Sequence, residues 1–168
     1  TYPDSVTITL KASVPGTYDI IVGEETYKLT VGNNGIATKT VKLIPGSYVA
    51  NVNYGGNANY SANKAKTSFN VLGNIAGLDA TVSSKTIEVD SSVTITSSVK
   101  KTDAAGKVTY KFDDGTDDVI ADIGEILSYT PKTVGEHTIT VSYDDGVYDP
   151  ETLTLTVNVN KKQNRIKV

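Results

Sequence analysis

Apolar and polar residues alternate along most of the chain. Val6, Ile8 and Leu10 are separated by Thr7 and Thr9, which places apolar side chains on one face of an extended strand. The same period of two recurs in Tyr18-Ile20-Val22, Tyr27-Leu29-Val31, Tyr48-Ala50-Val52-Tyr54 and Phe69-Val71. Turn residues separate these segments, at Pro15-Gly16, Asn33-Asn34-Gly35, Pro45-Gly46 and Gly55-Gly56-Asn57. Short strands divided by regular turns predict an all-β sandwich or barrel rather than a parallel α/β fold.

The second half of the chain repeats the first at an offset of about 88 residues. Ser5-Val6-Thr7-Ile8-Thr9 returns as Ser92-Val93-Thr94-Ile95-Thr96, residues 46–54 return as 135–143, and residues 69–71 return as 157–159. A seven-stranded sandwich needs about 100 residues or somewhat fewer. The 168 residues therefore predict two tandem immunoglobulin-like antiparallel β-sandwich domains.

The repeat also indicates the domain boundaries. We expect a first domain over residues 1–72, a Gly-rich linker over 73–77, a second domain over 78–160, and a tail or the start of a further repeat over 161–168. The second domain has an additional strand within residues 78–89, interrupted by Ser83-Ser84-Lys85, where the first has only four residues. We therefore expect the chain to be a piece of a longer protein, with the opening strand of the first domain missing and a sheet edge exposed.

Composition excludes several classes of function. The chain has no Cys, Met or Trp, so disulfides, thiolate metal sites and cysteine nucleophiles are excluded. The sequence contains no run of about 18 apolar residues, so we expect no membrane insertion by this chain.

The net charge of −3 conceals an asymmetry. Residues 1–72 carry six Lys against four acids, a net +2, whereas residues 73–160 carry six Lys against fifteen acids, a net −9. The last eight residues add +4. Nucleic-acid binding needs a clustered basic face, so the acidic second half argues against nucleic acid as a partner.

Two segments of the first half carry a family resemblance. They are Leu43-Ile44-Pro45-Gly46-Ser47-Tyr48 and Tyr54-Gly55-Gly56-Asn57-Ala58-Asn59-Tyr60. With the strands around them they resemble the bacterial and archaeal immunoglobulin-like repeats of surface adhesins, particularly the adhesin-like proteins of methanogenic archaea. The match covers residues 4–72. The second half departs from the pattern, with His137 in place of the tyrosine and Tyr143-Asp144-Asp145-Gly146-Val147-Tyr148 in place of the Gly-Asn loop. The resemblance implies long arrays that hold a binding region away from the cell envelope.

Five tyrosines take scaffold positions in the repeat. Tyr48 follows a Pro-Gly turn into a strand, which is typical of a corner tyrosine whose ring packs while its hydroxyl bonds back to the backbone. The others are the paired Tyr54 and Tyr60 of the first half and Tyr143 and Tyr148 of the second. We expect all five to be structural. An aromatic platform for sugar rings is the alternative for each pair.

The acidic turns of the second half are the candidates for metal binding. Asp113, Asp114 and Asp117 lie in one such turn, and Asp144 and Asp145 lie in another. Calcium takes six to eight oxygen ligands, but the spacing does not complete an EF-hand loop, and solvated Asp-Gly turns explain the residues equally well. Calcium is therefore a candidate ion, and we expect no other cofactor.

A catalytic site is not expected. His137, the single histidine, is in phase with Ile139 and Val141 on an expected strand and takes the place of a structural tyrosine. A catalytic triad would need the imidazole beside a nucleophile and an orienting acid. We therefore expect a non-enzymatic, extracellular and monomeric structural spacer of a cell-surface adhesin-like protein. Its parent would contact a host or neighbouring-cell protein or glycan. The alternative is a module that binds a glycan or protein through its sandwich end loops.

Overall fold

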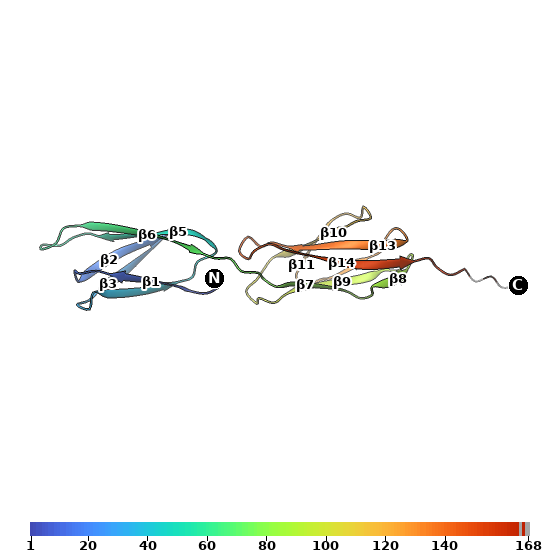
Figure 1. Ribbon diagram of the computed structural model, residues 1–168, viewed down its shortest axis with the longest axis horizontal. Helices are drawn as coiled ribbons and strands as arrows, with labels where there is room; N and C mark the ends of the chain where they lie inside the picture. Colours follow the sequence, from blue (N-terminus) through green and yellow to red (C-terminus); the bar gives the residue numbers. More distant parts are fainter. Residues whose placement is uncertain (165, 167–168) are drawn as a thin grey trace. The chain divides into compact units, whose positions relative to one another are not determined.

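The computed structural model describes residues 1–164 and 166, and across them regular structure consists of β-strands alone (Figure 1). The expected all-β class is thus confirmed. The chain divides into two compact units, Thr1–Asn74 and Ile75–Val168, called the first and second unit below. Their assignment as tandem immunoglobulin-like domains stays a prediction.

The first unit consists of two antiparallel sheets. One pairs β1 with β4, and the other has the order β3-β2-β5-β6. The strands are β1 Val6–Lys11, β2 Gly16–Val22, β3 Glu25–Val31, β4 Ile36–Val41, β5 Gly46–Tyr54 and β6 Asn63–Val71.

Alternation along these strands forms the core of the first unit. Ile20, Val22, Leu29 and Ala50 of the larger sheet are buried, and apolar side chains of the smaller sheet pack against them, including Ile8. Period-two patterning thus places the apolar face of each sheet toward the other.

The second unit also has two sheets. Their orders are β11-β10-β13-β14-β8 and β12-β9-β7. The strands are β7 Leu78–Val82, β8 Thr86–Glu88, β9 Val93–Val99, β10 Lys107–Phe112, β11 Val119–Asp122, β12 Ile126–Tyr129, β13 Gly135–Tyr143 and β14 Glu151–Asn160.

Both sheets of the second unit contribute fully buried residues to its core. Ile95 of the smaller sheet and Ile139 of the larger have no exposed surface. A polar contact also joins the sheets, because the buried Tyr110 hydroxyl donates to Ser97 Oγ at 2.8 Å. That bond satisfies two polar groups whose burial would otherwise be costly.

The expected additional strand forms, but it divides between the sheets. β7 pairs antiparallel with β9, whereas β8 pairs parallel with β14. The sequence predicted an antiparallel sandwich. The parallel pair of β8 and β14 shows that this prediction is wrong for one strand pair. The interruption at Ser83-Ser84-Lys85 is the crossing between the sheets.

The residues expected as a linker belong in part to the second unit. Ala76 is fully buried, and the Gly77 amide donates to a Glu151 carboxylate oxygen at 2.7 Å. Gly77 has φ 79°, and a Cβ added there would lie 3.0 Å from Lys100 Cβ. A glycine at this position thus lets the backbone pass close to the Lys100 side chain. Gly77 is therefore a packed residue rather than part of a free linker.

The expected tail, 161–168, includes Arg165, Lys167 and Val168, which lie outside the described residues. Across the described part of the chain, no helix is long and apolar enough to cross a membrane.

Candidate functional site

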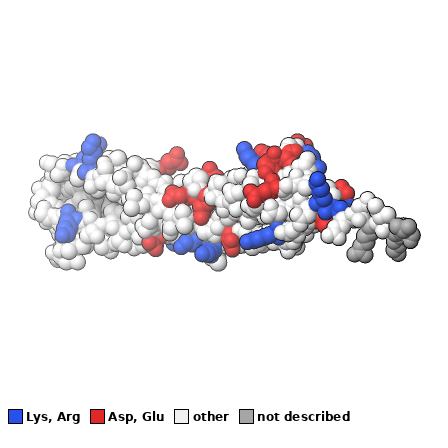
Figure 2. Space-filling model, turned by 45° about the vertical axis from the view of Figure 1, so that its right-hand side comes forward, with Lys and Arg blue, Asp and Glu red and all other residues white. Residues whose placement is uncertain are grey.

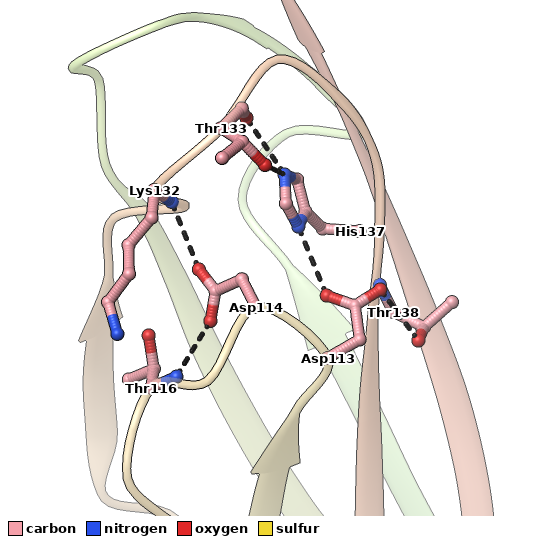
Figure 3. Close-up of polar contacts among 7 residues, drawn as sticks. All are labelled: Asp113, Asp114, Thr116, Lys132, Thr133, His137 and Thr138. Atoms are coloured by element: carbon pink, nitrogen blue, oxygen red, sulfur yellow. Dashed lines mark hydrogen bonds and ion pairs between the residues drawn. The ribbon is translucent and has the colours of Figure 1, made fainter.

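A polar cluster of the second unit lies at the turn after β10 (Figure 3). Asp113 follows that strand directly and faces the start of β13. Its Oδ2 accepts hydrogen bonds from the amide of Thr138 at 2.7 Å and from the hydroxyl of the same residue at 3.1 Å. Its Oδ1 lies 3.0 Å from Nδ1 of His137. One carboxylate therefore joins the end of β10 to β13.

His137 contacts hydrogen-bond acceptors through both ring nitrogens. Nε2 lies 2.8 Å from the Thr133 carbonyl oxygen, and Nδ1 faces the Asp113 carboxylate. A neutral imidazole carries one N–H, whereas the imidazolium carries two. The charged form is thus the one that satisfies both contacts.

The pKa values of this pair shift in opposite directions. Burial acts to lower the pKa of His137, but the bonds to Thr133 and Asp113, with the charges of Asp113 and Asp114, raise it above its ordinary value. Burial acts to raise the pKa of Asp113, but bonds from Thr138 and His137 lower it overall. Both shifts favour an ion pair in the folded state.

The pair of Asp113 and His137 resembles part of a catalytic triad, but its geometry favours a structural role. Thr133 Oγ1 lies 3.2 Å from His137 Nε2, which gives the order acid, imidazole, hydroxyl. Nε2 is closer to the Thr133 carbonyl oxygen, at 2.8 Å, and the His137 side chain is only 6% exposed. A general base needs a free lone pair within reach of a substrate, so this geometry favours a contact that stabilises the turn.

Asp114 stabilises the same turn from the other side. Its Oδ1 accepts from the Thr116 amide and its Oδ2 from the Lys132 amide, each at 3.0 Å. Burial acts to raise the pKa of Asp114, but these bonds and those from side chains beside it lower it strongly. Burial and the same carboxylate raise the pKa of Tyr129.

The other three candidate ligands lie elsewhere or point to solvent. Asp117 is exposed. Asp144 Oδ1 accepts from the Gly146 amide at 2.9 Å. Asp145 Oδ1 accepts from the amides of Val147 and Tyr148, at 2.9 and 2.8 Å.

The five carboxylates are thus dispersed over two turns, and protein donors occupy four of them. Nowhere in residues 1–164 and 166 do three or more His, Cys, Asp or Glu side chains gather in a way that could hold a metal ion. Acidic side chains do gather on the visible face of the second unit in Figure 2, but such surface charge is solvated. Calcium stays an untested candidate ion for these turns, and solvated Asp-Gly turns remain the alternative.

The corner contact occurs three times among the described residues. The Tyr48 hydroxyl donates to the Ile44 carbonyl oxygen at 2.9 Å, and His137 Nε2 makes the same contact four residues back to Thr133. Tyr18 donates to the Val14 carbonyl oxygen at 2.8 Å, a corner that the sequence analysis missed. Its signal was present, because a Pro-Gly pair precedes Tyr18 and Tyr48 at the same spacing.

The two tyrosine pairs have different surroundings. Tyr143 and Tyr148 are buried, and the Tyr143 hydroxyl donates to the Ala105 carbonyl oxygen and to Asp145 Oδ2. Tyr54 is also buried, but its hydroxyl has no partner among the described residues. Tyr60 is 51% exposed. Only the second pair is therefore fully part of a packed loop.

A cavity of about 420 Å³ lies on one side of the first unit. It is lined from β1 and the loop after it, from β2 and β5, and from the start of β6; the lining includes Leu10, Lys11, Tyr18, Tyr54, Tyr60 and Lys64. It has no carboxylate in its lining.

Comparison with known proteins gives similarities only among solved structures. Neither a family model nor a curated protein sequence matches the chain. The amphioxus IgVJ-C2 molecule is 15% identical over 90% of this chain and 96% of that chain, with a TM-score of 0.41. Fibronectin(III)-like modules of Clostridium thermocellum CbhA are 14% identical over 99% and 92%, with a TM-score of 0.40. The Yersinia pseudotuberculosis adhesin InvE is 19% identical over 93% and 55%, with a TM-score of 0.43. At such values these likenesses carry nothing about ligands or activity.

Proposed function

We propose that this chain is a structural spacer from the stalk of a cell-surface adhesin-like protein. In this role its two units are tandem immunoglobulin-like sandwiches outside the cell. They hold an adhesive region of the parent protein away from the cell surface, and that region contacts a protein or glycan of a host or neighbouring cell.

The observation that carries the proposal is the parallel pairing of β8 with β14. The two strands lie near the start and at the end of the second unit, and Thr86, Ile87 and Glu88 pair with Asn158, Val159 and Asn160. Two further backbone bonds extend the ladder, from Asn158 to Lys85 and from Val89 to Asn160, each at 2.8 Å.

Parallel pairing determines how this ladder carries tension. Pulling on the two ends of the unit draws β8 and β14 in opposite directions along their own axes. The hydrogen bonds lie across the strands, so they are loaded in shear and must break together rather than one by one. A stalk that bears tension benefits from this resistance.

The polar side chains of the second unit support the same role. Asp113, Asp114 and Asp145 accept backbone hydrogen bonds within their own turns. His137, the candidate for proton transfer, is buried and bonded at both nitrogens. These groups stabilise turns and leave little chemistry for a substrate.

A display experiment tests the spacer function. The chain is inserted between a surface anchor and a short peptide epitope on bacteria, and antibody capture is compared with that of an anchor-epitope fusion lacking the chain. We expect higher capture with the chain present, and no capture of host cells or glycans by a display lacking the epitope. Equal epitope capture with and without the chain would contradict the proposal.

Ligand binding is a second candidate function, and the cavity of the first unit favours it. Tyr60 is an exposed aromatic ring at this cavity, and sugar rings stack on such rings. A glycan array probed with the chain and with Tyr60→Ala tests this function. A signal that the variant loses would support it over the spacer. If neither the unmodified chain nor Tyr60→Ala gives a signal, the result would count against ligand binding.

A further inference from the structure

The loop between β5 and β6 carries the single N-glycosylation sequon of the chain. It is Asn59-Tyr60-Ser61, and Asn-x-Ser or Asn-x-Thr, with any residue but Pro in the middle, is the acceptor sequence for N-linked glycans. No other asparagine of the sequence is followed two positions later by Ser or Thr. The spacer function makes no use of this motif, so its surroundings in the fold indicate whether it can be modified.

Both residues that define the sequon lie on the surface of the folded unit. The loop covers residues 55–62, between the buried Tyr54 at the end of β5 and the start of β6. Asn59 and Ser61 are exposed, and the Tyr60 ring between them is 51% exposed. A glycan is bulky and hydrophilic, so its acceptor side chain must meet solvent. The sequon fulfils that condition.

Asn57, rather than Asn59, is the asparagine that stabilises this loop. Its Oδ1 accepts hydrogen bonds from the amides of Asn59 and Tyr60 at 2.8 and 2.9 Å. Its own amide donates to the Tyr60 carbonyl oxygen at 2.8 Å. Side-chain bonds of this kind are the usual structural reason for an asparagine in a turn. The loop therefore has its structural asparagine two residues before the sequon begins.

The carboxamide of Asn59 has no such structural role. Across residues 1–164 and 166, its Oδ1 and Nδ2 make no hydrogen bond within the protein. By contrast, Oδ1 of three other exposed asparagines accepts a hydrogen bond, at Asn34, Asn63 and Asn70. N-glycosylation uses the side-chain nitrogen as the nucleophile, so a carboxamide that no protein group holds is the state that the reaction needs.

Gly56 closes the base of the loop. It has φ 83°, and a Cβ added there would lie 2.8 Å from the Ala62 amide nitrogen and 3.0 Å from the Tyr60 carbonyl oxygen. Only a residue without a side chain allows the backbone to pass this closely. The chain therefore returns past Gly56, and the sequon lies in a short loop closed at its base rather than in a strand.

The second unit shows that a preceding segment can coexist with an accessible loop. There Ile75 pairs with Asp149 in a single parallel bridge. Val147 and Asp149 take the positions of Asn59 and Ser61 in the repeat. Val147 is half-buried and Asp149 is exposed, although the bridge is formed. Access to the sequon therefore does not depend on what precedes the first strand of its unit.

We propose that Asn59 is the acceptor of an N-linked glycan. Its Nδ2 attacks the anomeric carbon of the first sugar of a lipid-linked oligosaccharide. The bond from that carbon to the diphosphate oxygen breaks, the lipid diphosphate leaves with the bonding electrons, and Nδ2 gives up one proton. The Ser61 hydroxyl is the second group that the oligosaccharyltransferase recognises. The site rests on the proposed function, because N-linked glycans are added to proteins that leave the cytoplasm.

The experiment treats the purified, folded chain with a single-subunit oligosaccharyltransferase and a lipid-linked oligosaccharide, and measures the intact mass. A synthetic peptide of residues 55–63 is the reference acceptor. We expect the folded chain to gain the mass of one oligosaccharide, and peptide mapping to place it on Asn59. Asn59→Gln and Ser61→Ala should each lose the added mass completely, whereas Ser61→Thr, which keeps the hydroxyl, should retain it. The matched control Asn51→Gln, an exposed asparagine of the same unit outside the sequon, should be modified like the unaltered chain.

Three results would overturn the proposal. The first is modification of the peptide but not of the folded chain, which would mean that the folded loop does not reach the enzyme. The second is a lack of modification in both, with an enzyme that is active on a standard Asn-x-Thr peptide. The third is an added mass that persists in Asn59→Gln.

The mass measurement is independent of the display experiment on the spacer function. A chain that gains the glycan but gives no increase in epitope capture would support this site and contradict the spacer function. A chain that increases capture but gains no glycan would support the spacer function and overturn this site.

Discussion

His137 Nδ1 lies 3.0 Å from Oδ1 of Asp113, at the position where the first half of the chain has Tyr48. The histidine keeps the backbone contact of the tyrosine and adds a titratable partner for the carboxylate. The folded pKa of His137 is raised above its ordinary 6.5, so its contribution to stability is complete below pH 6.5 and is lost as pH rises through the folded pKa. The lowered pKa of Asp113 makes its contribution complete above its ordinary 3.8 and lost as pH falls through the folded value.

We therefore expect the second unit to be more stable at pH 5 than at pH 8. Urea unfolding at the two pH values measures the difference. His137→Tyr, which introduces the residue of the first half, should flatten the dependence because tyrosine does not titrate in this range. An equal slope in the variant would assign the dependence to other groups.

Removing the Asp113 carboxylate tests the turn contact itself. Asp113→Ala deprives the Thr138 amide and His137 of their acceptor, and hydrogen bonds to charged groups contribute about 1.5–3 kcal/mol. Because the Asp113 side chain is 37% exposed, we expect a loss near the lower end, about 1.5 kcal/mol, in urea unfolding. Asp117→Ala, an exposed acid of the same turn, is the control and should stay within about 0.5 kcal/mol.

Tyr48 tests the corner of the first unit. Its ring is half-buried and stacks on Phe69 at a centroid distance of 5.7 Å, and its hydroxyl bonds to Ile44. Full burial would make Tyr48→Ala cost about 3–5 kcal/mol, so at half burial we expect about 2 kcal/mol. Tyr48→Phe should lose only the hydrogen bond, about 1 kcal/mol. Thermal unfolding of both variants checks this, and equal losses would place the whole effect in the hydroxyl.

Calcium should have no specific effect on the second unit. Asp113, Asp114, Asp144 and Asp145 already accept hydrogen bonds from the protein, so a cation would have to displace those donors. We expect millimolar Ca²⁺ and Mg²⁺ to shift its melting temperature equally. A shift of several degrees with Ca²⁺ alone, lost in Asp114→Asn, would instead identify a calcium site.

The sequence predicted features that depend on local pattern and missed those that depend on pairing. Period-two alternation located the strands, and the Pro-Gly turn located the corner at Tyr48. Alternation predicts which face of the sheet a side chain occupies, but it does not predict which strand lies next to which. The parallel pairing of β8 with β14 therefore could not be foreseen. The contact between Asp113 and His137 joins residues far apart in sequence. Tyr60 and Tyr148 are equivalent in the repeat, yet one is exposed and the other buried, because the loops around them differ.

Single-molecule force spectroscopy on the whole chain, pulled from its two ends, tests the spacer function most directly. We expect two unfolding events, with the larger force for the second unit, because its β8–β14 ladder is sheared and the first unit has no such ladder among its described residues. Val89→Pro removes the amide that donates to Asn160 and should lower the larger force. Val134→Pro restores the Pro-Gly pair found before Tyr18 and Tyr48 and should leave it unchanged. Equal, low forces for both units, unaffected by Val89→Pro, would contradict a role in bearing tension.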